Sequence, residues 1–291
     1  MRKSIAIIIT SILVLSGCNK QQSVSDRLLN EVEKAIAINP DSASNLLKSI
    51  SSPEKLDDKA FARWCMLSGK ITDEIFNSIL PTYQLERAYD WYSSHGSPDE
   101  QVQILIYLGR SYFADGDYDK AMSIYTNALD IAGKNKLNNL IGYTYDYIGD
   151  LYREKFMRTE AIKRYEIAAE YFKKEKNTDS YACALRDIGR EYAQMDSLSH
   201  ALNILIIADS VAANTSNINV TASINNALGN IYSMQNKYDK AEEYLLKALL
   251  TGREKMPDYV ALIDLYTASN SINKAKELLS KIPQDTPPIY M

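Results

Sequence analysis

Two pairs of polar residues in this chain have the types and spacing to hold a peptide. Arg186 and Arg190 are four residues apart, so both guanidinium groups lie on one face if the segment is a helix. Asn226 and Asn230 repeat that spacing forty residues further along. Guanidinium forks bind carboxylates, and amide side chains pair with peptide backbone. We therefore expect these four side chains to hold an extended peptide or its terminal carboxylate.

The same arginines have acids nearby in the sequence, and this leaves a second interpretation open. Asp146, Asp150 and Asp187 can neutralise the arginines. The face would then be a solvated, charged surface with internal ion pairs and no ligand.

No residues in the chain have the spacing of a catalytic or metal site. His95, predicted in a loop, and His200, predicted at the start of a helix, have no metal-ligand partner at helical spacing. Ser52 and Lys55 match a Ser-x-x-Lys pattern, but Pro53 would disturb the helix that this nucleophile needs. There is no phosphate-binding loop and no dinucleotide fingerprint. We expect a protein that is not an enzyme and that holds no metal and no cofactor.

Composition excludes several other classes. The 291 residues are 46 % hydrophobic, which is too high for a disordered chain. A net charge of −4 argues against a nucleic-acid partner. Three Cys and two His cannot build a disulfide scaffold or a Cys/His zinc site. We expect Cys65 and Cys183, 118 residues apart, to be small buried side chains.

The N-terminus has the form of a targeting segment. Arg2 and Lys3 precede an apolar run over residues 5–15, which is shorter than the roughly 20 residues of a membrane-spanning helix. Leu15-Ser16-Gly17-Cys18 follows and resembles the lipobox of bacterial lipoproteins.

That resemblance implies the fate of the N-terminus. Residues 1–17 would be removed as a signal peptide, and the Cys18 thiol would carry a diacylglycerol. Residues 18–25 would then be the lipidated cysteine and a polar tether. Asn19 stands where an Asp would favour retention in the inner membrane. The expected location is therefore the cell envelope, with the outer membrane favoured.

Four glycines divide the middle of the chain into units of equal length. Gly109, Gly149, Gly189 and Gly229 follow one another at steps of 40 residues. Each has Leu or Ile before it and Tyr three residues after it, and each is followed by an Ala-x-x-x-Tyr/Leu-x-x-Ala pattern. These spacings predict two helices per unit, joined by a short turn. The small residues would mark the point where the two helices cross closely, and a large side chain would fill the space beside it.

This pattern resembles the tetratricopeptide repeat, with Leu-Gly-x-x-Tyr in the first helix and Ala-x-x-x-Tyr in the second. The 40-residue period is longer than the usual 34, as in the light-chain and regulator-type subgroups. The Pro that usually closes the second helix is absent. The position of the family's Trp is held by other residues: Leu105, Tyr145, Leu185 and Asn225. The resemblance implies an all-α fold, a right-handed α-α superhelix of about seven helical hairpins.

The repeat also predicts the limits of the parts of the chain. Residues 99–282 would form the array of 40-residue repeats. Residues 26–98 would form degenerate N-terminal hairpins, with helices near 55–75 and 82–95. Residues 283–291 would be an irregular tail.

In tetratricopeptide domains the first helices line a concave groove. Among the residues that the resemblance places at those positions, we take ten as the candidate groove: Gln103, Arg110, Tyr143, Asp146, Asp150, Arg153, Arg186, Arg190, Asn226 and Asn230.

We therefore predict a lipid-anchored scaffold or adaptor that holds another envelope protein, or a peptide segment of it, in this groove. The alternatives are a subunit of an outer-membrane assembly or uptake complex, and the sensor component of a regulatory system.

Overall fold

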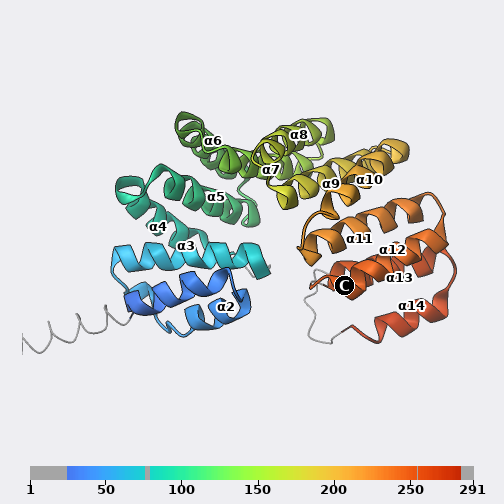
Figure 1. Cartoon of the computed structure of the whole chain (residues 1–291), viewed down its shortest axis with the longest axis horizontal. Helices are drawn as coiled ribbons and strands as arrows, with labels where there is room; N and C mark the ends of the chain where they lie inside the picture. The colour runs from blue at the N-terminus through green and yellow to red at the C-terminus, as the bar shows by residue number, and fades with distance from the viewer. Residues whose placement is uncertain (1–24, 76–78, 254, 283–291) are drawn as a thin grey trace, which may run out of the picture. The chain divides into compact units, whose positions relative to one another are not determined.

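The computed structural model describes residues 25–75, 79–253 and 255–282. Every regular element in these ranges is helical, and the helices follow one another as hairpins (Figure 1). We call the first helix of a hairpin its A helix and the second its B helix. Contacts group the chain into unit 1, up to Asn135, and unit 2, from Lys136. None of the described helices has both the length and the apolar character needed to cross a membrane.

The described part of unit 1 contains three hairpins. Its helices are residues 25–36, α2 (Pro40–Lys48), α3 (Asp58–Ile75), α4 (Thr82–His95), α5 (Pro98–Ala114) and α6 (Tyr118–Asn135), with a short 3-10 helix η1 (Pro53–Lys55).

The described part of unit 2 contains four hairpins. Its helices are α7 (Asn138–Glu154), α8 (Arg158–Lys174), α9 (Thr178–Gln194), α10 (Leu198–Ala212), α11 (Ile218–Met234), α12 (Tyr238–Thr251), α13 (Met256–Ala268) and α14 (Ile272–Leu279). The predicted fold class, an all-α solenoid of about seven helical hairpins, is confirmed over the described residues.

Side chains in the sequence fix where helices begin. At α2, the Asn39 side chain accepts a hydrogen bond from the backbone N–H of Ser42 (3.0 Å). At α5, the Ser97 hydroxyl accepts from the backbone N–H of Glu100 (3.3 Å), whose carboxylate accepts from the Ser97 N–H (2.9 Å). A proline occupies the first turn of both helices, where its missing N–H leaves no bond unmade. Capping of this kind satisfies backbone donors that a helix start leaves open.

The repeated glycines lie where the A and B helices of a hairpin cross. A Cβ atom at Gly149 would lie 2.4 Å from the ring of Tyr165, which is closer than side-chain atoms pack. The same crossing pairs Gly109 with Tyr125, Gly189 with Leu205 and Gly229 with Leu245. The predicted close crossing, with a large side chain filling the adjacent space, is confirmed at all four repeats.

The A–B turns of the four hairpins from α5 to α12 share one backbone conformation. Gly116, Phe156, Asp196 and Asn236, again forty residues apart, have φ of 79°, 57°, 58° and 58°. This left-handed conformation suits glycine and is tolerated by Asn and Asp, but it is unfavourable for a bulky side chain. Phe156 is therefore the exception within a regular series.

The predicted loop position of His95 is wrong, because α4 continues through this residue. The imidazole stacks on the Trp91 indole, with ring centroids 5.0 Å apart, and its Nδ1 lies 3.0 Å from the Trp91 carbonyl oxygen. His95 is the last residue of the helix, and Gly96 follows it.

Both described cysteines are free thiols. Cys65 is buried in unit 1, and Cys183 is half-buried in unit 2. Burial raises the pKa of the Cys65 thiol to about 12, so this side chain behaves as a small apolar group.

Candidate partner-binding face

All ten predicted groove residues lie on A helices, whereas Cys18 lies outside the described residues. Gln103 and Arg110 belong to α5 in unit 1. The other eight belong to α7, α9 and α11 in unit 2, and we call this set the A-helix face of unit 2: Tyr143, Asp146, Asp150, Arg153, Arg186, Arg190, Asn226 and Asn230.

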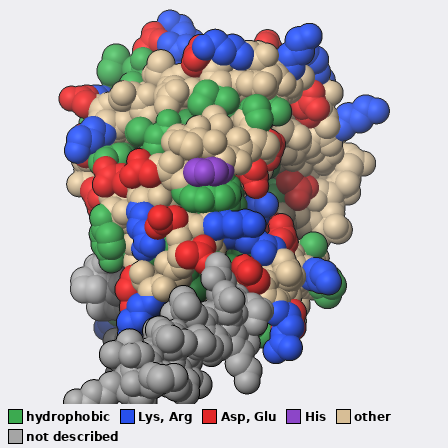
Figure 2. All heavy atoms as spheres, turned by 90° about the vertical axis from the view of Figure 1, so that its left-hand side faces the viewer, with side chains coloured by type: hydrophobic (Ala, Val, Ile, Leu, Met, Phe, Trp, Pro, Cys, Tyr) green, Lys and Arg blue, Asp and Glu red, His purple; other side chains and the backbone are tan. Residues whose placement is uncertain are grey.

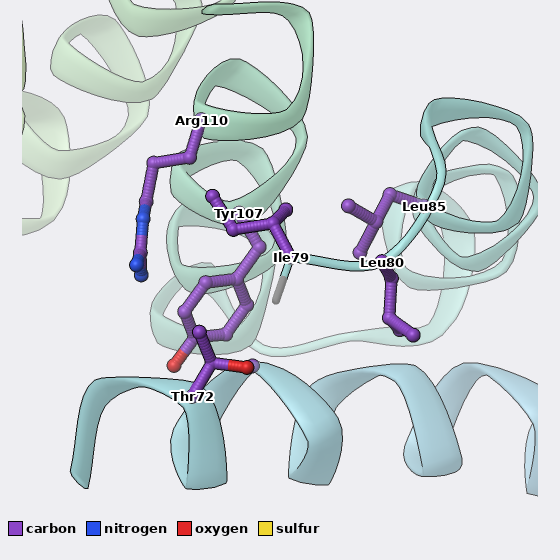
Figure 3. Close-up of a pocket in the computed structure, with 7 residues that line it drawn as sticks. Thr72, Ile79, Leu80, Leu85, Tyr107 and Arg110 are labelled. Carbon is purple, nitrogen blue, oxygen red and sulfur yellow. The ribbon is translucent and has the colours of Figure 1, made fainter. Parts of the chain in front are cut away.

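In unit 1, the predicted residues already have partners within the unit. Gln103 donates to the Asp99 carboxylate one turn earlier (2.6 Å). Arg110 forms an ion pair with Asp73 on α3, and the Tyr107 hydroxyl donates to the same carboxylate (2.9 Å). Figure 3 shows Arg110 and Tyr107 extending from α5 toward α3. The hollow that they line has a volume of about 10 Å³, which is the size of one water molecule.

A second hollow in unit 1 lies along α3 and α4. It has a volume of about 140 Å³ and is lined by Arg63, Lys70 and Trp91 among others. Arg63 is already paired with Glu33 (2.5 Å). Pockets that enclose whole ligands usually measure about 300–1,000 Å³, so this hollow fits a side chain rather than a cofactor. On the face shown in Figure 2, acidic and basic side chains are interspersed rather than gathered by sign.

In unit 2, Arg186 and Asp187 form the best-paired ions of the A-helix face. The Arg186 Nε and Nη2 donate to the two Asp187 oxygens at 3.0 and 2.7 Å, and its Nη1 donates to the Ser223 hydroxyl on α11 at 2.9 Å. Burial alone would raise the pKa of the Asp187 carboxyl, but Arg186 and Arg190 hold it below the ordinary value. Arg186 therefore links α9 to α11 and has few donors left for a ligand.

Arg190, one turn later on α9, is much less engaged. Its only described contact is a long one, from Nη1 to Asp187 at 3.4 Å, and 41 % of its side chain is exposed. Desolvation by burial, followed by repulsion from Arg186, lowers the pKa of the Arg190 guanidinium to about 10. A charge that its own surroundings disfavour is well placed to receive an anion.

Arg153 and Asp150 form a second ion pair, on α7. The Arg153 Nη1 lies 2.9 Å from the Asp150 carboxylate, which also accepts from the Tyr165 hydroxyl on α8 (2.7 Å). The Arg153 side chain is 38 % exposed, so it is a second arginine that solvent can reach on this face.

Asp146 is the acid of this face that forms no hydrogen bond or ion pair with the described residues. Its Oδ1 is buried and has no hydrogen-bond partner among the described residues. Burial raises the pKa of the Asp146 carboxyl well above its usual range, and the carboxylates of Asp150 and Asp187 raise it further. The nearby guanidinium groups of Arg186 and Arg153 oppose this shift.

The asparagine pair is largely occupied by the protein itself. Asn226 is buried, donates to the Asp258 carboxylate on α13 (2.7 Å) and accepts from Asn230 (3.0 Å). Asn226 therefore contributes to packing between hairpins, whereas the amide oxygen of Asn230 accepts no hydrogen bond from the described residues.

Tyr143 also has a structural role. Its hydroxyl accepts from Asn177 (3.1 Å) and Ser180 (2.9 Å), and its ring packs against Phe172 at 4.9 Å. It joins α7 to the start of α9.

Sequence reasoning missed several partners of the predicted residues. Ser223 and Asp258 bond to Arg186 and Asn226 from the following hairpin, 37 and 32 residues away. Because each lies about one repeat away from its partner, a search for complementary polar residues at that separation would have found both.

An ion pair between hairpins was also missed. Arg158 on α8 contacts the buried Glu191 on α9 at 3.0 Å, 33 residues away. No local sequence motif predicts this ion pair.

Family models identify the repeats in two places. A model described as tetratricopeptide repeat matches residues 221–256, and another with the same description matches residues 105–138. The first match covers most of α11 and α12, and the second covers most of α5 and α6.

One curated relative matches part of this chain. The photosystem I assembly protein Ycf3 of Rippkaea orientalis is 32 % identical over 91 residues, which is 31 % of this chain. The match spans about half (52 %) of the length of that relative.

Solved structures show the same fold at low sequence identity. A Rap protein complexed with competence and sporulation factor aligns with a TM-score of 0.63 and 14 % identity, covering 89 % of this chain and 76 % of that one. BtubC from P. vanneervenii aligns with a TM-score of 0.59 and 18 % identity, covering 69 % and 87 %. The apo form of the quorum sensor NprR from B. thuringiensis aligns with a TM-score of 0.56 and 15 % identity, covering 89 % and 75 %. The chain thus carries tetratricopeptide repeats and has the all-helical solenoid fold of the proteins built from them.

Proposed function

We propose that this protein is a scaffold or adaptor that binds a segment of another protein on the A-helix face of unit 2. The observation that carries the proposal is Arg190, a half-exposed guanidinium with a single long contact among the described residues. Arg153 offers a second exposed guanidinium on the neighbouring A helix. Guanidinium groups bind carboxylates through paired hydrogen bonds, so an acidic side chain or a terminal carboxylate is the expected anchor.

Arg190 is a better residue than Arg186 for testing partner binding by substitution. Arg186 holds Asp187 and Ser223, so replacing it would disturb the fold as well as the face. Arg190→Gln removes only the charge and leaves Asp187 paired with Arg186. Lys276→Gln is the matched control, because Lys276 is an exposed cation on α14, outside the proposed face.

The test is cross-linking in the native cell followed by mass spectrometry. We expect one or two abundant partners with the wild-type chain, the same partners with Lys276→Gln, and at least a tenfold loss with Arg190→Gln. An unchanged set of partners with Arg190→Gln would rule out binding through this face.

We further propose that the protein is tethered to the cell envelope by lipid on Cys18. The support is the sequence alone, in which Leu15-Ser16-Gly17-Cys18 follows a short apolar run. A tether would raise the local concentration of the face near other envelope proteins. Metabolic labelling with an alkyne fatty acid tests it: the wild-type chain should become labelled and Cys18→Ser should not, whereas equal labelling of both would exclude this anchor.

A sensor role is the second candidate, because the aligned Rap and NprR structures each cover 89 % of this chain. The Rap protein is complexed with competence and sporulation factor, and NprR is a quorum sensor. A sensor would respond to a small diffusible ligand. A scaffold would instead show stable protein neighbours in the cross-linking experiment.

A further inference from the structure

The buried Oδ1 of Asp146, on α7, is an acceptor on the A-helix face of unit 2 that no described residue satisfies. The arginines around it direct their described bonds elsewhere. Those of Arg186 go to Asp187, Ser223 and the Cys183 sulfur, and those of Arg153 go to Asp150 and Tyr165. The influence of both arginines on Asp146 is electrostatic, without a described hydrogen bond.

An acceptor in this state destabilises the folded chain. A buried polar atom without a partner costs about 1–3 kcal/mol, and a charged one costs more. Native chains satisfy nearly all such atoms, so each exception requires an explanation. The raised pKa of Asp146 agrees with this, because it shows that the surroundings disfavour the carboxylate.

The way the charges are paired indicates what is missing. Three guanidinium groups and two carboxylates belong to the face, and the Asp187 carboxylate lies beside them: Arg153, Arg186, Arg190, Asp146, Asp150 and Asp187. Their formal charges cancel, but every described ion pair among them goes to Asp150 or Asp187. Asp146 is left without a cation, and Arg190 is left with one long contact. A positively charged group bound against the half-buried Asp146 side chain would offset the charge of its carboxylate, which no described ion pair does.

We propose that Asp146 receives a cationic group of the bound partner: a lysine or arginine side chain, or an N-terminal ammonium group. This inference rests on the proposed function and makes it more specific. Asp146 on α7 takes the cation, and Arg190 on α9 takes the anion. The face then selects segments that carry both charges in a fixed order, rather than acidic segments in general.

The experiment uses the full chain purified in a non-ionic detergent and an array of amidated, acetylated 15-residue peptides. The peptides have an alanine–serine background, with one Lys and one Glu placed at every pair of positions. Two matched arrays replace either the Lys or the Glu by Gln. The chains tested are the wild type, Asp146→Asn, Arg190→Gln and the control Glu170→Gln, an exposed acid on α8.

We expect the wild type and Glu170→Gln to bind the best Lys–Glu peptides at least tenfold better than either Gln version. Asp146→Asn should lose the preference for Lys and keep the preference for Glu, and Arg190→Gln should do the reverse. Circular dichroism and thermal unfolding of each variant would show that binding is lost without loss of the fold.

The contrary outcomes separate the two proposals. A preference for Glu that depends on Arg190, with no preference for Lys, would overturn the cation subsite and leave the proposed function standing. A preference for Lys that survives in Asp146→Asn would also overturn it. The absence of both preferences in the wild type would overturn the subsite together with carboxylate binding by this face.

Discussion

Arg186 and Arg190 have the same side chain and lie one helical turn apart, yet the fold gives them different roles. Arg186 is 18 % exposed and makes a bidentate pair with the buried Asp187, whereas Arg190 is 41 % exposed and touches the same carboxylate only at 3.4 Å. Their spacing in the sequence predicts the same role for both arginines. The difference arises from Ser223, which draws the Arg186 guanidinium toward α11.

This difference predicts unequal effects on stability. Arg186→Gln should lower the free energy of unfolding by about 3 kcal/mol, because it leaves the buried Asp187 without its main partner. Arg190→Gln should change it by less than about 1 kcal/mol, as is usual for an exposed ion pair. Urea denaturation followed by circular dichroism measures both, and equal effects would contradict the roles assigned here.

Asp146 predicts a pH dependence of stability. Because its folded pKa is raised, the folded chain holds this proton more tightly than the unfolded chain does. The penalty for the ionised form is therefore fully present above the folded pKa and disappears as the pH falls toward the ordinary value for Asp.

Asp146→Asn should consequently be more stable than the wild type at pH 7.5, and its advantage should shrink as the pH is lowered toward 4. Urea denaturation at several pH values would show this. An Asp146→Asn chain that is less stable than the wild type at pH 7.5 would mean that the carboxylate supports the fold.

Among the elements, the hairpins depend most on the crossing at the repeated glycines. Gly149→Ala should lower the free energy of unfolding by about 1–3 kcal/mol, since the new methyl group must displace the Tyr165 ring. At Gly133, within α6, an added Cβ would point into open space, with no atom within 4 Å apart from those of the adjoining residues and the helix's own backbone. Gly133→Ala should therefore stabilise by roughly 0.5–1 kcal/mol through helix propensity, and similar effects at the two sites would refute the crossing argument.

In the turn between α7 and α8, a bulky residue has the left-handed backbone conformation that Gly, Asp and Asn have in the corresponding turns. Phe156 is 79 % exposed and has φ of 57°, so its ring adds little packing to offset the strained backbone. Phe156→Gly should stabilise the chain by about 1 kcal/mol in thermal unfolding. Phe156→Ala keeps the strained backbone and removes only the ring. If this variant gained the same stability, the exposed ring rather than the backbone conformation would be what destabilises the wild type.

The sequence predicts these elements well because their causes are local. The 40-residue recurrence of glycine, and of the large residue sixteen positions later, determines both helices of a hairpin and where they cross. The candidate site is less predictable. Which acid pairs with Arg186 depends on side chains from two helices, and the burial of Asn226 depends on Asp258 in the next hairpin. The loop prediction for His95 fails because a Ser-rich stretch resembles a loop, although stacking on Trp91 keeps this residue in α4.

At the scale of the whole chain, stability should vary along unit 2. In a solenoid each hairpin is stabilised mainly by its neighbours. Leu205 on α10 is fully buried, whereas Leu279 on α14, at the corresponding type of position, is 59 % exposed. Amide hydrogen exchange should therefore be slowest in α9 and α10 and much faster in α13 and α14. Uniform protection along unit 2 would contradict the view that each hairpin is stabilised mainly by contacts with its neighbours.

The equal spacing of the four glycines has a consequence for how such a chain can change in length. Residues 178–217 run from the first residue of α9 to the residue before α11, which is one complete 40-residue module. A tandem duplication of this segment would place a second α9 after α10, where α11 now begins, and would preserve the phase of every later helix. Recombination between neighbouring copies could thus add or remove one module, with its Arg186 and Arg190, at a time. Chains that differ by multiples of forty residues would then carry different numbers of these arginines and could bind ligands of different lengths.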